Sequence, residues 1–100
     1  MGKFKPLFLE KISIINYNMA IHEGNAKQRL ASQCRPILLL PIEEVPERFL
    51  TEYKKLIAMI RNELSYYPKG LEIGNFIGKR NSTAVKYIKM LMEIEYVIRE

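Results

Sequence analysis

Hydrophobic positions recur at helical spacing near the start of the chain. Side chains spaced three or four residues apart fall on one face of a helix, and the chain has such a row at Phe8, Ile12, Ile15 and Met19. Pro6 suits the first turn of a helix, so a helix over 7–21 is predicted. The β-branched run 12–15 leaves a strand open as the alternative for this segment.

The pattern breaks at Gly24–Asn25 and resumes over a shorter stretch. Asn25 is of the residue type that caps a helix N-terminus, so a helix is predicted from Ala26 to about Cys34, buried through Leu30 and Cys34. Arg35 precedes a proline, which disfavours helical backbone angles there. Residues 37–40, between two prolines, are either a buried extended piece or a kinked continuation of the helix.

The clearest pattern predicts a helix over 46–65. Pro46 suits a first helical position, and Glu47 is favourable near the positive end of the helix dipole. One continuous apolar stripe follows, made of Phe49, Leu50, Tyr53, Leu56, Ile57, Ile60 and Leu64. Charged and polar residues occupy the opposite side, as in a helix that buries one face.

The last third of the chain is patterned as two helices joined by a tight turn. A short helix over 71–77 meets Gly78, which can end it in a left-handed conformation. Asn81 or Ser82 can cap the next helix, predicted over 82–94. Its expected buried residues are Ala84, Val85, Ile88, Leu91 and Met92. Its expected outward residues are Thr83, Lys86, Lys89 and also Tyr87 and Met90.

Residues 70–99 resemble the helix-turn-helix of winged-helix transcriptional regulators. The residues that carry the resemblance are Glu72, Ile73, Gly74, Ile77, Gly78, Ser82, Thr83, Ala84, Ile88, Leu91, Tyr96 and Val97. The helix over 46–65 stands where the first helix of such a domain is expected. Val97, Ile98 and Arg99 are placed to start a wing, although no complete hairpin follows before the last residue given.

The resemblance implies a DNA-binding regulator that reads duplex DNA through helix 82–94, as recognition helices do in a major groove. Ser82, Thr83, Lys86 and Tyr87 would lie on the recognition face, with Lys79 and Arg80 near phosphates. Lys89, on the outward side, completes the expected DNA-binding set. Such regulators commonly bind as dimers, and residues 7–21, through the row Phe8, Ile12, Ile15 and Met19, are the expected homodimer contact.

Length and composition are those of one small globular domain spanning 1–100. The chain has 100 residues, 48% hydrophobic and 27% charged, and a net charge of +5, a balance typical of folded rather than disordered chains. Excess positive charge favours polyanionic partners. The expected fold class is all-α, or mainly α with a short C-terminal strand: a small helical bundle that contains a helix-turn-helix.

The sequence offers little for catalysis. One cysteine, Cys34, and one histidine, His22, are present, and neither has partners at the spacing of a metal site or a nucleophile pair. Run 74–80 has the wrong spacing for a phosphate loop. We therefore expect no enzyme, no metal and no cofactor. Cys34 is predicted to be a buried thiol, with a reactive thiol or an intermolecular disulfide as the alternative.

No apolar run reaches the about 20 residues that span a bilayer, and Glu10 and Lys11 interrupt the apolar start, so no membrane association and a cytoplasmic location are expected. A second hypothesis comes from a different functional class. It is a small helical adaptor or inhibitor, of the kind encoded by phages and mobile elements, that binds another protein and no nucleic acid. Its expected contact residues are Tyr66, Tyr67, Tyr87 and Met90.

Overall fold

The chain folds into an all-α bundle in the computed structural model, which describes residues 6–66, 76 and 79–100. The elements are α1 (Pro6–Ile21), α2 (Ala26–Ser32), α3 (Cys34–Leu38), a 3-10 turn η1 (Ile42–Glu44), α4 (Glu47–Tyr66) and α5 (Asn81–Arg99). These described ranges contain no strand, which confirms the predicted all-α class. None of their helices is both long enough and apolar enough to cross a membrane.

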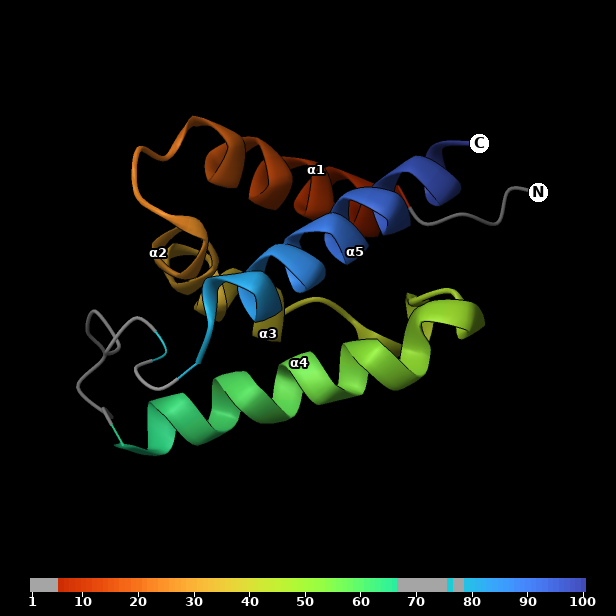
Figure 1. Ribbon diagram of the computed structural model, residues 1–100. Helices are drawn as coiled ribbons and strands as arrows, with labels where there is room; N and C mark the ends of the chain where they lie inside the picture. Colours follow the sequence, from red (N-terminus) through yellow and green to blue (C-terminus); the bar gives the residue numbers. More distant parts are fainter. Residues whose placement is uncertain (1–5, 67–75, 77–78) are drawn as a thin grey trace.

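The long helix α5 packs against α1, α2 and α4. It runs antiparallel to α1 and lies between α1 and α4 in the view of Figure 1, where α2 and α3 fill one end of the bundle. The core is contributed by every α-helix and includes Phe8, Ile12, Ile15, Met19, Leu30, Cys34, Ile37, Tyr53, Leu56, Ile60, Phe76, Ala84, Tyr87, Leu91 and Ile94. Burial of this apolar surface is the main term that stabilises the fold.

Two long helices match their sequence predictions closely. α1 covers the predicted 7–21, so the strand alternative is wrong, and α4 covers the predicted 46–65 to within a residue at each end. In α4 the residues Tyr53, Leu56 and Ile60 are fully buried, as the centre of a continuous stripe should be. α1 differs from α4 because apolar residues also lie on its outer side.

The second segment forms two short helices rather than one. The predicted cap is confirmed: the Asn25 side chain accepts a hydrogen bond from the N–H of Gln28, and the Gln28 side chain accepts one from the N–H of Asn25. The helix then breaks at Gln33. Arg35 is helical, contrary to expectation. Pro36 lies in the first turn of α3, where backbone N–H groups have no partner within the helix, so its missing N–H costs no helical hydrogen bond.

The C-terminal segment is more helical than predicted. α5 continues to Arg99, so residues 97–99 are helical and do not begin a wing strand. The physical reason is that Ile94 and Ile98 extend the buried face of the helix by one more turn. The predicted helix over 71–77, apart from Phe76, and the predicted bend at Gly78 lie outside the described residues.

Candidate functional site

The N-terminal end of α5 presents part of the predicted DNA-binding set to solvent. Lys79, Arg80 and Ser82 are exposed, and Thr83 is half-buried. Arg80 is the N-cap residue and makes no side-chain capping bond. The predicted cap Asn81 instead points its side-chain oxygen at α2, where it accepts a hydrogen bond from the N–H of Lys27 at 3.1 Å. Asn81 therefore joins two helix N-termini rather than capping its own.

Lys86 is exposed but engaged with α4. Its Nζ lies 3.3 Å from Glu52 Oε1 and 4.8 Å from the centre of the Tyr87 ring. Glu52 also accepts a hydrogen bond from Lys55. These two hydrogen bonds lower the pKa of Glu52, and the bond from Lys55 has the larger effect. Lys86 thus has an intramolecular partner that a phosphate would have to replace. Lys89, one turn further on, is exposed.

Tyr87 does not belong to an outward face. It is 5% exposed and Met90 is 7% exposed, whereas Val85 and Met92, which were expected to be buried, are 39% and 50% exposed. The sequence prediction was wrong here because nearly the whole circumference of α5 carries apolar residues. Packing against three helices, rather than periodicity, decides which of them is buried. Tyr87 therefore belongs neither to the predicted recognition face nor to the contact residues of the adaptor hypothesis. Met90 is buried as well, so it too is excluded from those contact residues.

The outer face of α1 carries four large apolar side chains that the described residues leave in solvent. Leu7, Ile14, Tyr17 and Ile21 are 61%, 53%, 64% and 60% exposed. The row that was expected to form a homodimer contact is on the other side: Phe8, Ile12, Ile15 and Met19 are at most 2% exposed and form the core of the monomer. That expectation is corrected because a buried row cannot also be an interface.

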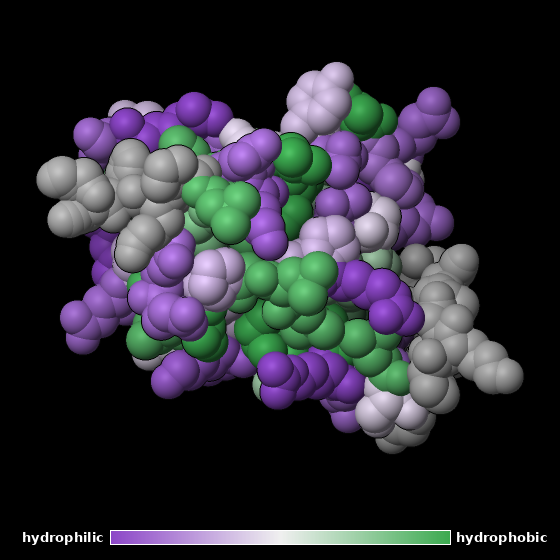
Figure 2. Space-filling view, turned by 180° about the vertical axis from the view of Figure 1, so that it is seen from behind, coloured by the Kyte–Doolittle hydropathy of each residue, from purple (hydrophilic) through white to green (hydrophobic). Residues whose placement is uncertain are grey.

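Apolar side chains are exposed away from α1 as well. Leu39, after α3, is 71% exposed and Ile42 is 38% exposed. Figure 2 shows the face opposite to that of Figure 1, where hydrophobic side chains gather near the centre between hydrophilic borders. Single exposed apolar residues are common on protein surfaces. The row on α1 has four members on one side of one helix, whereas Val85, Met92 and Tyr96, which are exposed on one side of α5, make a row of three.

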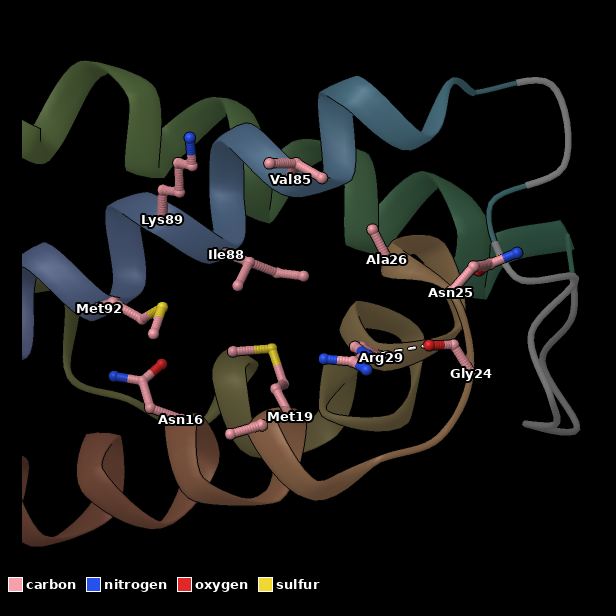
Figure 3. A pocket seen from close by; sticks show the side chains of 11 residues that line it. Asn16, Met19, Gly24, Asn25, Ala26, Arg29, Val85, Ile88, Lys89 and Met92 are labelled. Atoms are coloured by element: carbon pink, nitrogen blue, oxygen red, sulfur yellow. Dashed lines mark hydrogen bonds between the residues drawn. The ribbon is translucent and has the colours of Figure 1, made fainter.

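A hollow of about 470 Å³ opens between α1, α2 and α5. Figure 3 shows its lining: Met19, Ile88 and Met92 surround the space, Asn16 lies at one side and Arg29 at another. Asn16 is 7% exposed, and its Oδ1 has no hydrogen-bond partner among the described residues. A buried carbonyl oxygen without a hydrogen bond lowers the stability of a protein by about 1–3 kcal/mol. The hollow is unusual in having such an oxygen beside it.

No family model, no curated protein and no solved structure matches this chain. The surfaces above are therefore the observations from which a function is inferred.

The remaining chemistry-bearing residues have structural surroundings. Burial, and secondarily the charge of Glu63, raises the pKa of the Cys34 thiol to about 12, so the thiol is protonated at neutral pH and unreactive. The predicted buried thiol is confirmed. His22 Nδ1 accepts a hydrogen bond from the N–H of Gly24 at 2.9 Å and closes the turn after α1. Within the described ranges, no three His, Cys, Asp or Glu side chains gather as a metal site would require.

Sequence reasoning missed Asn16 and Arg29, which line the hollow, and Glu95, which is the hydrogen-bond partner of Asn16. Asn16 is a polar residue within the buried side of α1, and a polar residue between Ile15 and Met19 is the one signal that could have drawn attention to it. Glu95 accepts hydrogen bonds from Asn16 and from Ser13. That link joins positions about 80 residues apart, and no local pattern predicts it.

Proposed function

We propose that this chain is a protein-interaction module that binds a helix of another polypeptide on the outer face of α1. The single observation that carries the proposal is the row Leu7, Ile14, Tyr17 and Ile21, each more than half exposed. Full burial of such a side chain is worth about 1.5–3 kcal/mol. A row of four left in water therefore represents a large unused driving force for association.

The spacing of the row favours a helical partner. Its members are separated by seven, three and four residues, which is the seam that pairs one helix with another. Three of its four members are symmetrical about Ile14, since Leu7 and Ile21 each lie seven residues away; Tyr17 has no apolar counterpart, because Lys11 stands at the matching position. A two-fold axis through Ile14 would place Leu7 of one copy against Ile21 of the other. The first partner to test is therefore α1 of a second copy.

Charge is compatible with this pairing. α1 carries one acidic and one basic residue, Glu10 and Lys11, so two such helices meet without net repulsion. The rest of the chain carries the net charge of +5. The contact would thus be made by the least charged long helix of the molecule.

The experiment places a photoreactive p-benzoylphenylalanine at Tyr17 and, as the matched control, at Leu39, which is exposed on another element. Irradiation of the purified chain and of cells that express it should give a discrete adduct from position 17 only. Light scattering after size exclusion reports whether the purified chain has twice its mass of 11.8 kDa. Ile14→Glu should remove both the adduct and any dimer.

Adduct formation that is equal at positions 17 and 39, or an adduct that persists in the folded Ile14→Glu variant, would contradict the proposal. Circular dichroism of each variant establishes that it is folded. An adduct with a second copy identifies the homodimer. An adduct with one other protein, obtained from position 17 alone, identifies a different partner for the same face.

Duplex DNA binding is a second candidate, favoured by one observation. Lys79 and Arg80 are exposed at a helix N-terminus that has no side-chain cap, and such a terminus attracts phosphate; Lys89 is exposed further along the same helix. A gel-shift titration with random duplex from about 50 to 200 mM salt tests it. Arg80→Ala and Lys89→Ala should each weaken binding, and the control Lys54→Ala on α4 should not. No shift in low salt would reject this candidate and leave the first untouched.

A further inference from the structure

The hollow between α1, α2 and α5 has a defined polar end. The Asn16 amide nitrogen donates to the carbonyl oxygen of Leu91 at 3.1 Å and to Glu95 Oε1 at 2.9 Å. Both of its hydrogens are therefore used, and the side chain is fixed with its oxygen on the opposite side. Figure 3 shows that oxygen directed toward the space beside Met92 and Met19.

The orientation of the amide is set by Glu95. Burial acts to raise the pKa of Glu95, but hydrogen bonds from Asn16, Ser13 and Arg99 outweigh it and lower that pKa. An ionised carboxylate only accepts hydrogen bonds. Asn16 must consequently turn its NH₂ group to Glu95. Its Oδ1 is left without a partner on the side of the hollow, where neighbouring side chains cover it almost completely, so it can accept a bond from an occupant once one of those side chains moves aside.

A cation lies on another side of the same space. Arg29, on α2, donates from Nε to the carbonyl oxygen of Gly24 at 2.8 Å, which anchors the guanidinium beside Met19 (Figure 3). Gly24 keeps this turn tight, since a Cβ there would lie 2.8 Å from Gln28 Cβ. The terminal nitrogens of Arg29 have no hydrogen bond to other described residues and can bind an anion. Lys89 also lines the space, but its amine points away from it.

We propose that this hollow binds a small carboxylic acid with an apolar body and one N–H or O–H donor. The donor would bond to Asn16 Oδ1, the carboxylate to Arg29, and the apolar body would pack on Met19, Ile88 and Met92. The size of about 470 Å³ lies within the range of small-molecule sites. The site is independent of the outer face of α1, so either inference can fail without the other.

The test uses indole-3-propionate as the probe and its benzofuran isostere, in which oxygen replaces the ring N–H. Binding is followed by NMR of the chain labelled with ¹³C at its methionine methyl groups. Met19 and Met92 line the hollow, whereas Met59 and Met90 do not and serve as internal controls. The probe should shift Met19 and Met92 only, and should bind about tenfold more tightly than the isostere, as one buried hydrogen bond predicts.

Variants separate the contributions. Arg29→Gln should weaken binding of the probe. Val85→Trp places a large ring at a partly exposed position of the lining and should block binding. Lys55→Gln, a charge change on α4, should leave it unchanged. Asn16→Ala should make the probe and the isostere bind equally, and if that variant does not fold, the comparison of the two ligands on the unaltered chain decides alone. Equal binding of both ligands to the unaltered chain, shifts at Met59 as large as at Met19, or no shift at millimolar probe would overturn the proposal.

Discussion

The carboxylate of Glu63 accepts a hydrogen bond from the backbone N–H of Phe76 at 2.8 Å, and both residues are buried. Phe76 has a φ of 59°, a left-handed conformation that is unfavourable for a residue with a side chain. Its ring is nonetheless part of the core. Glu63 therefore holds the chain, in the turn before α5, in a conformation that its own backbone would not prefer.

Removal of this acceptor should destabilise the protein. Glu63→Ala leaves the Phe76 N–H buried without a partner, and we expect the free energy of unfolding to fall by about 1–3 kcal/mol. Glu63→Gln retains an acceptor oxygen and should lose less. Urea unfolding at neutral pH measures both. The matched control is Glu43→Ala, an exposed glutamate of η1, and a Glu63→Ala variant as stable as this control would show that the bond contributes nothing.

Stability should fall at alkaline pH because two buried acids resist ionisation. Burial raises the pKa of Cys34 from its ordinary 9.0 to about 12 and that of Tyr53 from 10.0 to about 12. Above pH 9 the unfolded chain releases the thiol proton while the folded chain keeps it, so the folded state binds more protons and loses stability as pH rises. The slope from the thiol alone is about 1.4 kcal/mol per pH unit.

The comparison that isolates this effect is urea unfolding of the unaltered chain and of Cys34→Ala at pH 8, 9 and 10. The variant begins less stable because it leaves a small cavity, but its stability should decline less between pH 9 and 10. Parallel pH profiles for the two proteins would mean that the thiol ionises equally in the folded and unfolded states. Iodoacetamide should likewise label Cys34 in urea and not in the folded protein.

Sequence pattern predicted the fold best where one face of a helix is apolar and the other is not. α4 is such a helix, and its bounds and its buried centre at Tyr53, Leu56 and Ile60 were predicted correctly. α5 carries apolar residues on most sides, so Val85 and Met92 were assigned to the core while Tyr87, which is buried, was assigned to the surface. Tertiary packing selects among such positions, and periodicity alone does not.

The candidate sites were less predictable because they depend on contacts between distant segments. The exposure of Lys79, Arg80 and Lys89 was expected, but the ion pair of Lys86 with Glu52 joins α5 to α4 and has no local signature. The same applies to the hollow, whose polar end exists only because Asn16 on α1 meets Glu95 on α5. The helix-turn-helix resemblance stays a prediction, since most of its first helix and its turn lie outside the described residues.

Two adjacent residues of α1 should differ strongly in how much stability the same substitution costs. Ile15 is 2% exposed and Ile14 is 53% exposed. Ile15→Ser places a hydroxyl and a cavity in the core, so we expect a loss of about 3 kcal/mol or more. Ile14→Ser should change the stability of the monomer by about 0.5 kcal/mol or less. Dilute samples, measured by thermal and urea unfolding, keep association from contributing, and equal losses at both positions would show that the two faces of α1 are assigned wrongly.

The capping box at the start of α2 should be worth a measurable part of the stability. Asn25→Ala removes the acceptor for the Gln28 N–H, and helix caps of this kind contribute about 1 kcal/mol. Asn25→Asp keeps an acceptor in the same place and should restore most of the loss, because a carboxylate also suits the positive end of a helix. Asn62→Ala, at an exposed position within α4, controls for the loss of an amide and should be neutral or slightly stabilising, since alanine favours helix. Urea unfolding of the three variants ranks them, and an Asn25→Ala variant no less stable than Asn62→Ala would remove the cap as a determinant of where α2 begins.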